Sequence, residues 1–421
     1  MRILWAKAGG ILPLDSGGRI RSYHIATELA RRHDVTLFTF YAAIDPDPHV
    51  TLLGPFVKVE RMPLDLSERA STADMAAYAA NTLTLKPYQM RKYCRPEVAR
   101  RLRELLQEDR YDALICDFLL AADVVPWDAP IPKVIFTHNV EAAIWRRHME
   151  VATNPLWKAL AWREYRAWER AERRYTGMAD HVLTVSDDDR RAFLSFLPAE
   201  RLTTIPTGVD LEFFRPDRSA PDSSSIVFTG AMEWLPNEDA IVFFASEILP
   251  LIQQQIPGVT LWVVGRKPTR KVIAIGERNP AIRVTGAVDD IRPHVHRAAA
   301  YVVPLRIGGG TRIKIFEAMG MGMPIVSTTV GAEGLPVTHE QDILLADAPE
   351  DFARQTVRLL RDAELNDRLG RAARALVESQ YSWAAVTNVL VRVLEGLATP
   401  GPARSGNDNA PAGRTRGHRG T

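Results

Sequence analysis

The stretch 308–319 combines residue types that suit an anion: a run of glycines, the start of a helical pattern and two cations. Its members are Gly308, Gly309, Gly310, Thr311, Arg312 and Lys314. A glycine turn that opens a helix presents free backbone N–H groups and the positive end of the helix dipole. Because that dipole disfavours cations in the first turn, a bound phosphate or diphosphate explains Arg312 and Lys314 better than a solvated surface does.

Glu317 lies three positions beyond Lys314 in the same predicted helix, 311–321. A carboxylate one turn inside a phosphate-binding helix can reach a ribose 2′/3′-diol, which is a pair of neutral hydrogen-bond donors. Phosphate and ribose together indicate a nucleotide. The local pattern is only moderately specific, since other glycine-rich junctions between a strand and a helix look similar.

A second cluster, His138, Asn139 and Glu141, follows the predicted strand 133–136. Open α/β sheets bind ligands at the carboxyl ends of their parallel strands. A single histidine is more often a hydrogen-bonded structural residue than a catalyst. The sequence therefore leaves both interpretations of His138 open.

Gly17 and Gly18 lie between a predicted strand at 2–5 and a predicted helix at 20–32, and a strand at 35–40 completes a βαβ unit. This is the Rossmann-type position for contact with a ligand. The spacing differs from the Gly-x-Gly-x-x-Gly of dinucleotide-binding proteins, and a plain tight turn is the alternative.

The remaining polar clusters predict no metal site. Three aspartates follow Ser186, which is a good helix N-cap, and acidic residues suit the first turn of a helix. His294 and His296 are two positions apart on a helix and point in different directions. We therefore expect neither a metal nor a cofactor.

The composition indicates a globular protein, with 46% apolar and 25% charged residues. A net charge of +2 gives no case for nucleic-acid binding. The two cysteines, Cys94 and Cys116, fit a reducing cytoplasm. No apolar run approaches the ~20 residues of a membrane span, and the N-terminus is typical of a strand rather than a signal peptide.

The predicted helix 157–175 has two contrasting faces. Its apolar stripe consists of Trp157, Leu160, Ala161, Trp168, Ala171 and Tyr175, and its basic side of Arg163, Arg166, Arg170 and Arg174. We favour a helix that packs on the core with a solvated face. The alternative is an interfacial helix near anionic lipid.

Strands alternate with helices along the chain, which predicts an α/β protein with parallel sheets covered on both faces. The length suggests two domains. We expect a first domain at 1–205, a linker at 206–225, a second domain at 226–382, a last helix at 383–397 and a disordered tail at 398–421. The helices expected in the second domain before that last helix are 237–255, 268–278, 311–321 and 350–361.

Six segments together resemble one protein family. They are Gly17-Gly18-Arg19-Ile20-Arg21, Thr137-His138-Asn139-Val140-Glu141, Val185-Ser186, Ile205-Pro206-Thr207-Gly208-Val209-Asp210, Phe228-Thr229-Gly230 and the stretch 308–324. In this order and spacing, over nearly all of 1–397, the chain resembles a GT-B glycosyltransferase of the family 4 (group 1) type. The subtype it most resembles is the bacterial sugar transferases of exopolysaccharide clusters.

The resemblance implies two Rossmann-like domains that face a cleft, with the nucleotide-sugar in the second domain and the last helix crossing back to the first. It also implies residue roles. Glu317 would hold the ribose, Arg312 and Lys314 would lie near the diphosphate, and His138 would contact the donor sugar. The other donor-side residues would be Gly17, Gly18, Gly230, Gly308, Gly309, Gly310 and Thr311. Those on the acceptor side would be Arg19, Arg21, Asn139 and Glu141.

Two positions depart from the family pattern. Many members carry two glutamates eight positions apart, and the first of these positions is Gly309 here. Many also carry an arginine and a lysine after the strand that corresponds to 226–229, where this chain has 230–237 without either. Arg312 and Lys314 are the cations left to compensate.

The resemblance implies a retaining sugar transfer from a nucleotide-sugar to a saccharide or a lipid-linked saccharide. No carboxylate pair stands out for a glycosidase-like double displacement, so we expect same-face attack by the acceptor hydroxyl. We expect a cytoplasmic enzyme, with peripheral contact at the inner membrane face left open. The alternatives are a nucleotide-sugar epimerase and a non-catalytic sugar-nucleotide-binding partner of an assembly complex. A phosphorylase would need a lysine for pyridoxal phosphate, for which we find no candidate.

Overall fold

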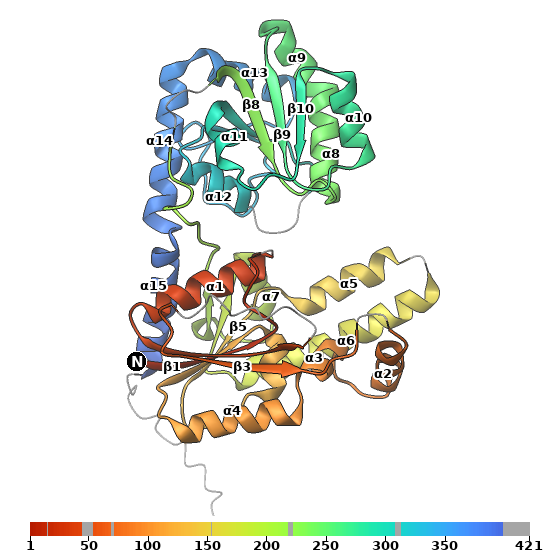
Figure 1. Cartoon of the computed structure of the whole chain (residues 1–421), viewed down its shortest axis with the longest axis vertical. Helices are drawn as coiled ribbons and strands as arrows, with labels where there is room; N and C mark the ends of the chain where they lie inside the picture. Colours follow the sequence, from red (N-terminus) through yellow and green to blue (C-terminus); the bar gives the residue numbers. More distant parts are fainter. Residues whose placement is uncertain are drawn as a thin grey trace, which may run out of the picture.

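The computed structural model describes residues 1–14, 16–43, 54–68, 71–152, 154–217, 222–307 and 313–398. They form two α/β domains that lie one above the other along the long axis (Figure 1). Each domain has its own parallel sheet, as the alternation of strands and helices predicts.

The sheet of the N-terminal domain has the strand order β3-β2-β1-β4-β5-β6-β7, and its strands pair in parallel. The strands are β1 (Arg2–Ala8), β2 (Asp34–Ala42), β3 (Lys58–Leu64), β4 (Ala113–Asp117), β5 (Lys133–Phe136), β6 (His181–Thr184) and β7 (Leu202–Thr204). The central strands β4, β5 and β6 are buried throughout, because helices cover both faces of the sheet.

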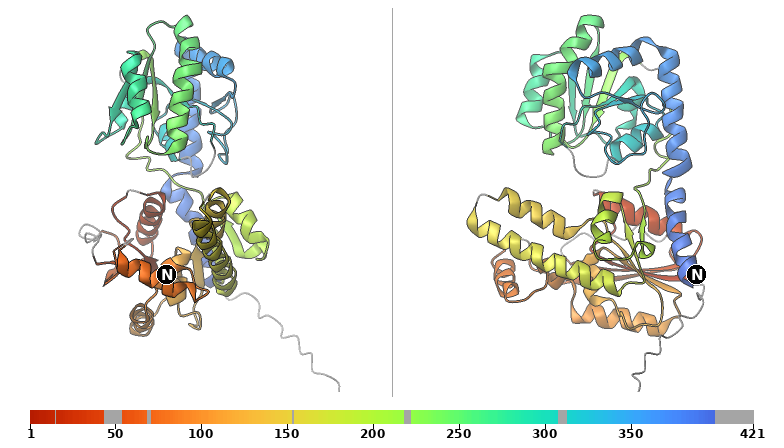
Figure 2. Two further views of the ribbon diagram at one scale, coloured as in Figure 1. Left: turned by 90° about the vertical axis from the view of Figure 1, so that its right-hand side faces the viewer. Right: turned by 180° about the vertical axis from the view of Figure 1, so that it is seen from behind.

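The helices of this domain are α1 (Gly17–Ala30), α2 (Thr72–Thr82), α3 (Tyr88–Tyr93), α4 (Pro96–Glu108), η1 (Leu119–Val124), α5 (Glu141–Val151), α6 (Pro155–Met178), α7 (Asp187–Leu194) and η2 (Ala199–Arg201). Helices α5 and α6 form a hairpin that projects from the domain (Figures 1 and 2). Trp168 and Tyr175 of α6 are buried as the apolar stripe predicts, whereas Trp157 is exposed. Ser186 caps α7 by accepting the Asp189 N–H, as predicted.

The sheet of the C-terminal domain has the order β10-β9-β8-β11-β12-β13. Its strands are β8 (Asp222–Thr229), β9 (Thr260–Val264), β10 (Ile282–Gly286), β11 (Ala298–Val303), β12 (Ile325–Ser327) and β13 (Leu344–Leu345). Its helices are α8 (Leu235–Phe243), η3 (Phe244–Ile248), α9 (Leu249–Gln255), α10 (Arg270–Arg278), α11 (Arg292–Arg297), α12 (Ile313–Gly320), α13 (Pro349–Arg361) and α14 (Ala363–Gln380). Strand β8 begins inside the predicted linker 206–225.

One predicted helix is interrupted and one helix was not predicted. The expected helix 237–255 contains the π-helical segment η3, just before Pro250, which lacks the N–H that a regular α-helix would use. Helix α14 has no counterpart among the predictions. Its N-cap Asp362 and the buried Leu365, Leu369, Ala373 and Val377, each four residues apart, are nevertheless typical helix signals.

The last described helix, α15 (Trp383–Ala398), crosses back to the N-terminal domain, as expected from the resemblance (Figure 2). Its buried residues Trp383, Val386, Leu390 and Leu394 belong to the same apolar cluster as β1 and α1. The predicted disordered tail, apart from Ala398, lies outside the described residues.

Candidate functional site

The N-termini of α1 and α12 approach each other across the domain boundary. A Cβ atom on Gly17, the first residue of α1, would lie 3.7 Å from Cδ1 of Ile313, the first residue of α12. Both helices follow the carboxyl ends of parallel strands and line the space between the domains (Figure 1). Two positive helix ends therefore point at one region, which suits a diphosphate.

Lys314 is held by one residue of strand β8 and one that follows it. Its Nζ donates to Oδ1 of Asn237 at 2.7 Å and lies 4.3 Å from the ring centroid of Phe228. A Cβ atom on Gly230 would lie 3.0 Å from this Nζ, so the predicted residues Gly230 and Lys314 are neighbours. Asn237, which the sequence did not single out, therefore orients the cation through a neutral oxygen.

Gly230 also touches Gly265 at the end of β9. A Cβ atom on Gly265 would lie 1.8 Å from the carbonyl oxygen of Gly230, which no side chain can tolerate. The two strand ends thus pack backbone to backbone beside Lys314, and only glycine permits that approach.

Glu317 is half-buried on α12, one turn from Lys314. Burial raises its pKa to about 7, although the charge of Lys314 opposes the shift. Within the described residues, no hydrogen bond or ion pair holds this carboxylate. A half-buried acceptor of this kind is suited to a ligand that brings hydroxyl donors.

The glycine turn itself lies outside the described residues. It comprises Gly308, Gly309, Gly310, Thr311 and Arg312. Their roles in binding the donor therefore remain predictions.

A buried polar network lies under the N-terminus of α1. Asp117, which is 0% exposed, accepts from Nε1 of Trp5 at 3.0 Å and pairs with Nζ of Lys7 at 3.2 Å. Burial alone would raise the pKa of Asp117, but the charge of Lys7 and the hydrogen bond from His138 hold it below its usual value. Burial lowers the pKa of Lys7 despite this partner.

His138 uses both ring nitrogens inside this network. Nδ1 lies 3.1 Å from Nη1 of Arg21 and Nε2 lies 2.7 Å from Oδ1 of Asp117. A guanidinium only donates, so Nδ1 accepts and the proton is on Nε2. Burial lowers the pKa of His138 to about 4, against the effect of Asp117, so the ring is neutral. His138 is therefore a hydrogen-bonded, buried histidine in this structure. Its contact with the donor sugar stays a prediction.

The predicted acceptor-side residues occupy different environments. Arg21 is 3% exposed and donates from Nε to Oγ1 of Thr207 at 3.1 Å, so it connects the network to the interdomain linker. Its acceptor-side role stays a prediction. Asn139 is exposed and donates to Oε1 of Glu141 at 3.4 Å, and Arg19 and Glu141 are half-buried. Burial raises the pKa of Glu141.

Phe118 explains why residue 18 is glycine. A Cβ atom on Gly18 would lie 2.5 Å from Cζ of Phe118. The Phe118 ring stacks on His138 at 3.8 Å between centroids, and Nζ of Lys7 lies 4.1 Å from its centroid. Phe118 has a φ of 70°, a strained value for a non-glycine residue, which often marks a functional site.

Neither Lys7 nor Asp117 is among the residues predicted from the sequence. The signal was a charged residue near the end of each of two largely apolar strands, Lys7 in β1 and Asp117 in β4. Lys7 and Asp117 are register partners where these strands pair. Two opposite charges at matching positions of neighbouring buried strands indicate a pair.

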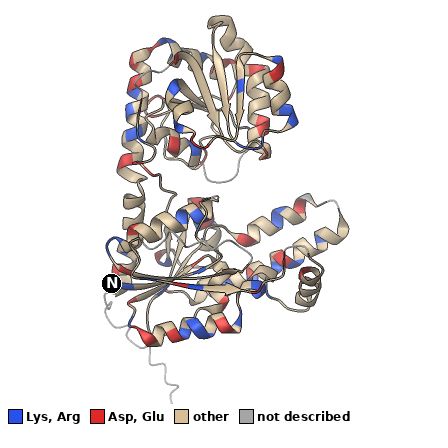
Figure 3. Cartoon of the chain, viewed as in Figure 1, with Lys and Arg blue, Asp and Glu red and all other residues tan. Residues whose placement is uncertain are grey.

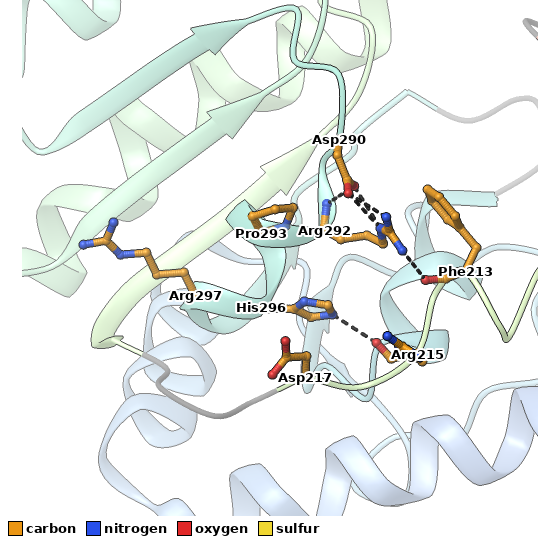
Figure 4. A pocket seen from close by; sticks show the side chains of 8 residues that line it. All are labelled: Phe213, Arg215, Asp217, Asp290, Arg292, Pro293, His296 and Arg297. Carbon is orange, nitrogen blue, oxygen red and sulfur yellow. Dashed lines mark hydrogen bonds and ion pairs between the residues drawn. The ribbon is translucent and has the colours of Figure 1, made fainter.

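A separate cavity of about 380 Å³ lies between the linker and α11 (Figure 4). Arg292 donates to Asp290 and to the Phe213 carbonyl, and His296 is hydrogen-bonded to the Arg215 carbonyl at 3.1 Å. None of its lining residues belongs to α1 or α12. Asp290, Arg292 and His296 thus bond to other groups that line the cavity.

A metal cluster or a membrane span would change the chemistry of the site. Among the described residues, no cluster of histidine, cysteine, aspartate and glutamate could hold a metal ion. No helix in that part of the chain is long and apolar enough to span a bilayer.

Two family models match the chain. The model described as Glycosyltransferase Family 4 matches residues 16–213, and the model described as Glycosyl transferases group 1 matches residues 223–362. The two matches fall on the two domains seen in the structure.

Two relatives illustrate the sequence similarity. An uncharacterized 44.6 kDa protein in the cps region of Klebsiella pneumoniae is 20% identical over 293 residues, covering 67% of this chain and 74% of that protein. The GDP-mannose-dependent alpha-(1-6)-phosphatidylinositol monomannoside mannosyltransferase of Mycobacterium tuberculosis is 27% identical over 249 residues, covering 53% and 64%.

Solved structures show the same architecture. Anabaena Alr3699/HepE in complex with UDP has a TM-score of 0.64 at 16% identity, covering 94% of this chain and 100% of that one. WaaG, a glycosyltransferase involved in lipopolysaccharide biosynthesis, has a TM-score of 0.57 at 15% identity with the same coverage. With the family matches on both domains, the chain belongs to the family 4 (group 1) glycosyltransferases and has the GT-B fold.

Proposed function

We propose that this glycosyltransferase moves a sugar from a nucleotide-sugar donor to a hydroxyl of a saccharide or lipid-linked saccharide, with retention of anomeric configuration, in bacterial polysaccharide biosynthesis. The observation that carries the proposal is that α12 carries both Lys314 and the half-buried Glu317, which has no hydrogen bond or ion pair among the described residues. The N-terminus of this helix faces that of α1. Cation and helix ends suit a diphosphate, and the carboxylate suits a ribose diol.

The similar proteins support the donor and the pathway. Alr3699/HepE has been solved with UDP and with UDP-glucose. The mycobacterial relative is named for GDP-mannose and for a phosphatidylinositol-linked acceptor. The Klebsiella relative lies in a cps region.

In the proposed mechanism the acceptor hydroxyl attacks the face from which the diphosphate leaves, and the leaving diphosphate takes its proton. Lys314 and the N-termini of α1 and α12 stabilise the negative charge that develops on the leaving group, in place of a metal ion. Asp117 is unsuited to act as a nucleophile, because it is buried under three donors. The protein's main contributions are orientation and electrostatic stabilisation.

The direct test offers UDP-, GDP-, ADP- and dTDP-sugars in turn and follows release of the nucleoside diphosphate with and without a saccharide or polyprenyl-linked acceptor. Acceptor-dependent release with chelator present, and a product of unchanged anomeric configuration by NMR, would support the proposal. Binding without release would identify a non-catalytic partner. Conversion of the donor into an epimer would identify an epimerase.

Lys314→Ala should lower kcat more than it raises KM for the donor, because charge on the leaving group grows in the transition state. Steady-state kinetics with saturating acceptor measures both constants. Asn237→Ala is the matched control, since it removes the residue that orients Lys314 and leaves the cation in place. If Lys314→Ala instead weakens donor binding as much as it lowers kcat, Lys314 stabilises the bound donor and the transition state equally.

A further inference from the structure

One corner of the N-terminal domain exposes large apolar side chains from two separate segments. We call the following residues the apolar corner: Leu83 (91% exposed), Leu85 (68%), Leu156 (70%), Trp157 (45%) and Trp162 (55%). The first two lie between α2 and α3, and the others lie in the first turns of α6. Single exposed apolar residues are ordinary, whereas several gathered together indicate an interaction surface.

Arg163 fixes the two segments to each other. Its Nη2 donates to the carbonyl oxygens of Asn81 at 2.7 Å, of Thr84 at 2.8 Å and of Lys86 at 2.8 Å. It also pairs with the buried Glu164, which accepts the N–H of Tyr88. The leucines are therefore held beside α6 as part of one built surface.

Exposed basic side chains lie on the segments of the apolar corner and on the neighbouring helices α3 and α5: Lys86, Arg91, Arg146, Arg147, Lys158 and Arg166. Three of them, Lys86, Arg146 and Arg166, are ion-paired with Asp123, Glu150 and Glu169. Both signs of charge occur along α5 and α6 (Figure 3), but Lys158, beside Trp157, has no ion pair among the described residues. Exposed tryptophan and leucine with neighbouring lysine and arginine suit the boundary between anionic headgroups and acyl chains.

We propose that the apolar corner docks onto an anionic lipid bilayer. Leu156 and Trp157 lie in the first turn of α6, next to the turn of the projecting α5–α6 hairpin (Figures 1 and 2). This placement favours insertion into a soft surface over the flat, extended contact of ~800 Å² per partner typical of protein interfaces. This favours a bilayer over a second protein or a second copy of the chain.

The position of α5 relates this surface to the site and rests on the proposed function. Helix α5 begins at Glu141, directly after His138 and Asn139, and its eleven residues rise by about 16 Å toward the corner. Trp157 packs against Trp145 of α5, with 6.2 Å between ring centroids, and closes the hairpin. A lipid-linked acceptor embedded at the corner would thus lie within reach of the acceptor side.

The test is flotation of the full chain, without donor or acceptor, on vesicles of pure phosphatidylcholine and of phosphatidylcholine with 30 mol% phosphatidylglycerol. The expected result is binding to the anionic vesicles that weakens with added salt. The quadruple variant Leu83→Ser, Leu85→Ser, Leu156→Ser and Trp162→Ser should lower the partition coefficient at least about tenfold. Trp157 is left intact because it supports the hairpin.

The matched control is Leu235→Ser with Ile273→Ser, which removes exposed apolar residues (63% and 41%) from the other domain and should float like wild type. Equal losses in both variants, or no flotation of the wild type, would overturn the proposal. A wild-type dimer that the quadruple variant abolishes would assign the corner to a second copy and would also overturn it. Calorimetric donor binding is measured separately, so failure of the proposed function is distinguishable from failure of docking.

Discussion

Glu317 has no partner within the described part of the chain, which makes its contribution to ligand binding separable from folding. Glu317→Ala should weaken nucleotide-sugar binding by about 10- to 100-fold, since a hydrogen bond to a charged group contributes about 1.5–3 kcal/mol. Calorimetric titration with the donor measures the change, and the melting temperature should stay close to that of wild type. An unchanged affinity would remove Glu317 from the ribose site.

The raised pKa of Glu317 also predicts a pH dependence of stability. The carboxyl ionises near 4.5 in the unfolded chain and near 7 in the folded protein. Between these values the folded state binds more protons, so this group makes the free energy of unfolding fall as pH rises through that window. Glu317→Gln should remove that fall. Melting curves recorded between these pH values should show the melting temperature of the variant rising relative to that of wild type as the pH increases.

Asp117 and Asp109 are both ion-paired aspartates, but one is buried and the other lies at the surface. Asp117→Asn should cost about 3–5 kcal/mol, because it leaves Lys7 buried without a countercharge. Asp109→Asn, which breaks an exposed pair with Arg2, should cost less than about 1 kcal/mol. Urea unfolding measures both. Similar losses would mean that the buried network does not depend on its charge.

At the scale of elements, the start of α1 is shaped by the residue that follows β4. Gly18→Ala should destabilise the protein by about 1–3 kcal/mol, because the new methyl group overlaps Phe118. Adding Phe118→Leu should restore much of that loss. Urea unfolding measures the stability of both variants, and calorimetry measures their affinity for the donor. If the double variant is stable but still binds the donor weakly, Gly18 also approaches the diphosphate.

The strands were the most predictable elements. The strand at 133–136 has the predicted bounds, since a short apolar run between turn residues marks a buried parallel strand. Helix α14 was missed although its signals were present, and η3 could not be foreseen because a helix pattern does not show where its hydrogen-bond register shifts.

The sequence predicted part of the arrangement around α12. Lys314 and Glu317 lie one turn apart because their motif is local in sequence, whereas Gly230 reaches Lys314 through a tertiary contact. Arg21 and His138 were assigned to ligands, but both are buried in bonds to each other and to Asp117 and Thr207. That network joins residues 21 to 207 through tertiary contacts, which no local spacing reveals.

At the scale of the molecule, the two chain crossings between the domains are bonded to each other. The N–H of Val209 donates to the carbonyl of Tyr381 at 2.7 Å, and Gly208 lies against the ring of Trp383. Tyr381 stacks on Phe316 of α12 with 4.5 Å between centroids. The junction therefore contacts the same helix that carries Lys314 and Glu317.

A saturating nucleotide-sugar should make the protein more compact in solution scattering, and acceptor alone should not. The reason is that a diphosphate would contact the ends of α1 and α12 at once, one from each domain. Glu317→Ala should need more donor to reach the compact state. Identical scattering curves with and without donor would contradict closure.

The place of α15 has a consequence for how the protein is made. The apolar cluster under α1 includes Leu390 and Leu394, which the ribosome adds almost four hundred residues after Met1. The N-terminal domain emerges first, yet part of its interior arrives last, after the whole of the other domain. During synthesis the first domain therefore lacks this part of its apolar core until α15 has been made, and α15 then completes the cluster beside β1 and α1.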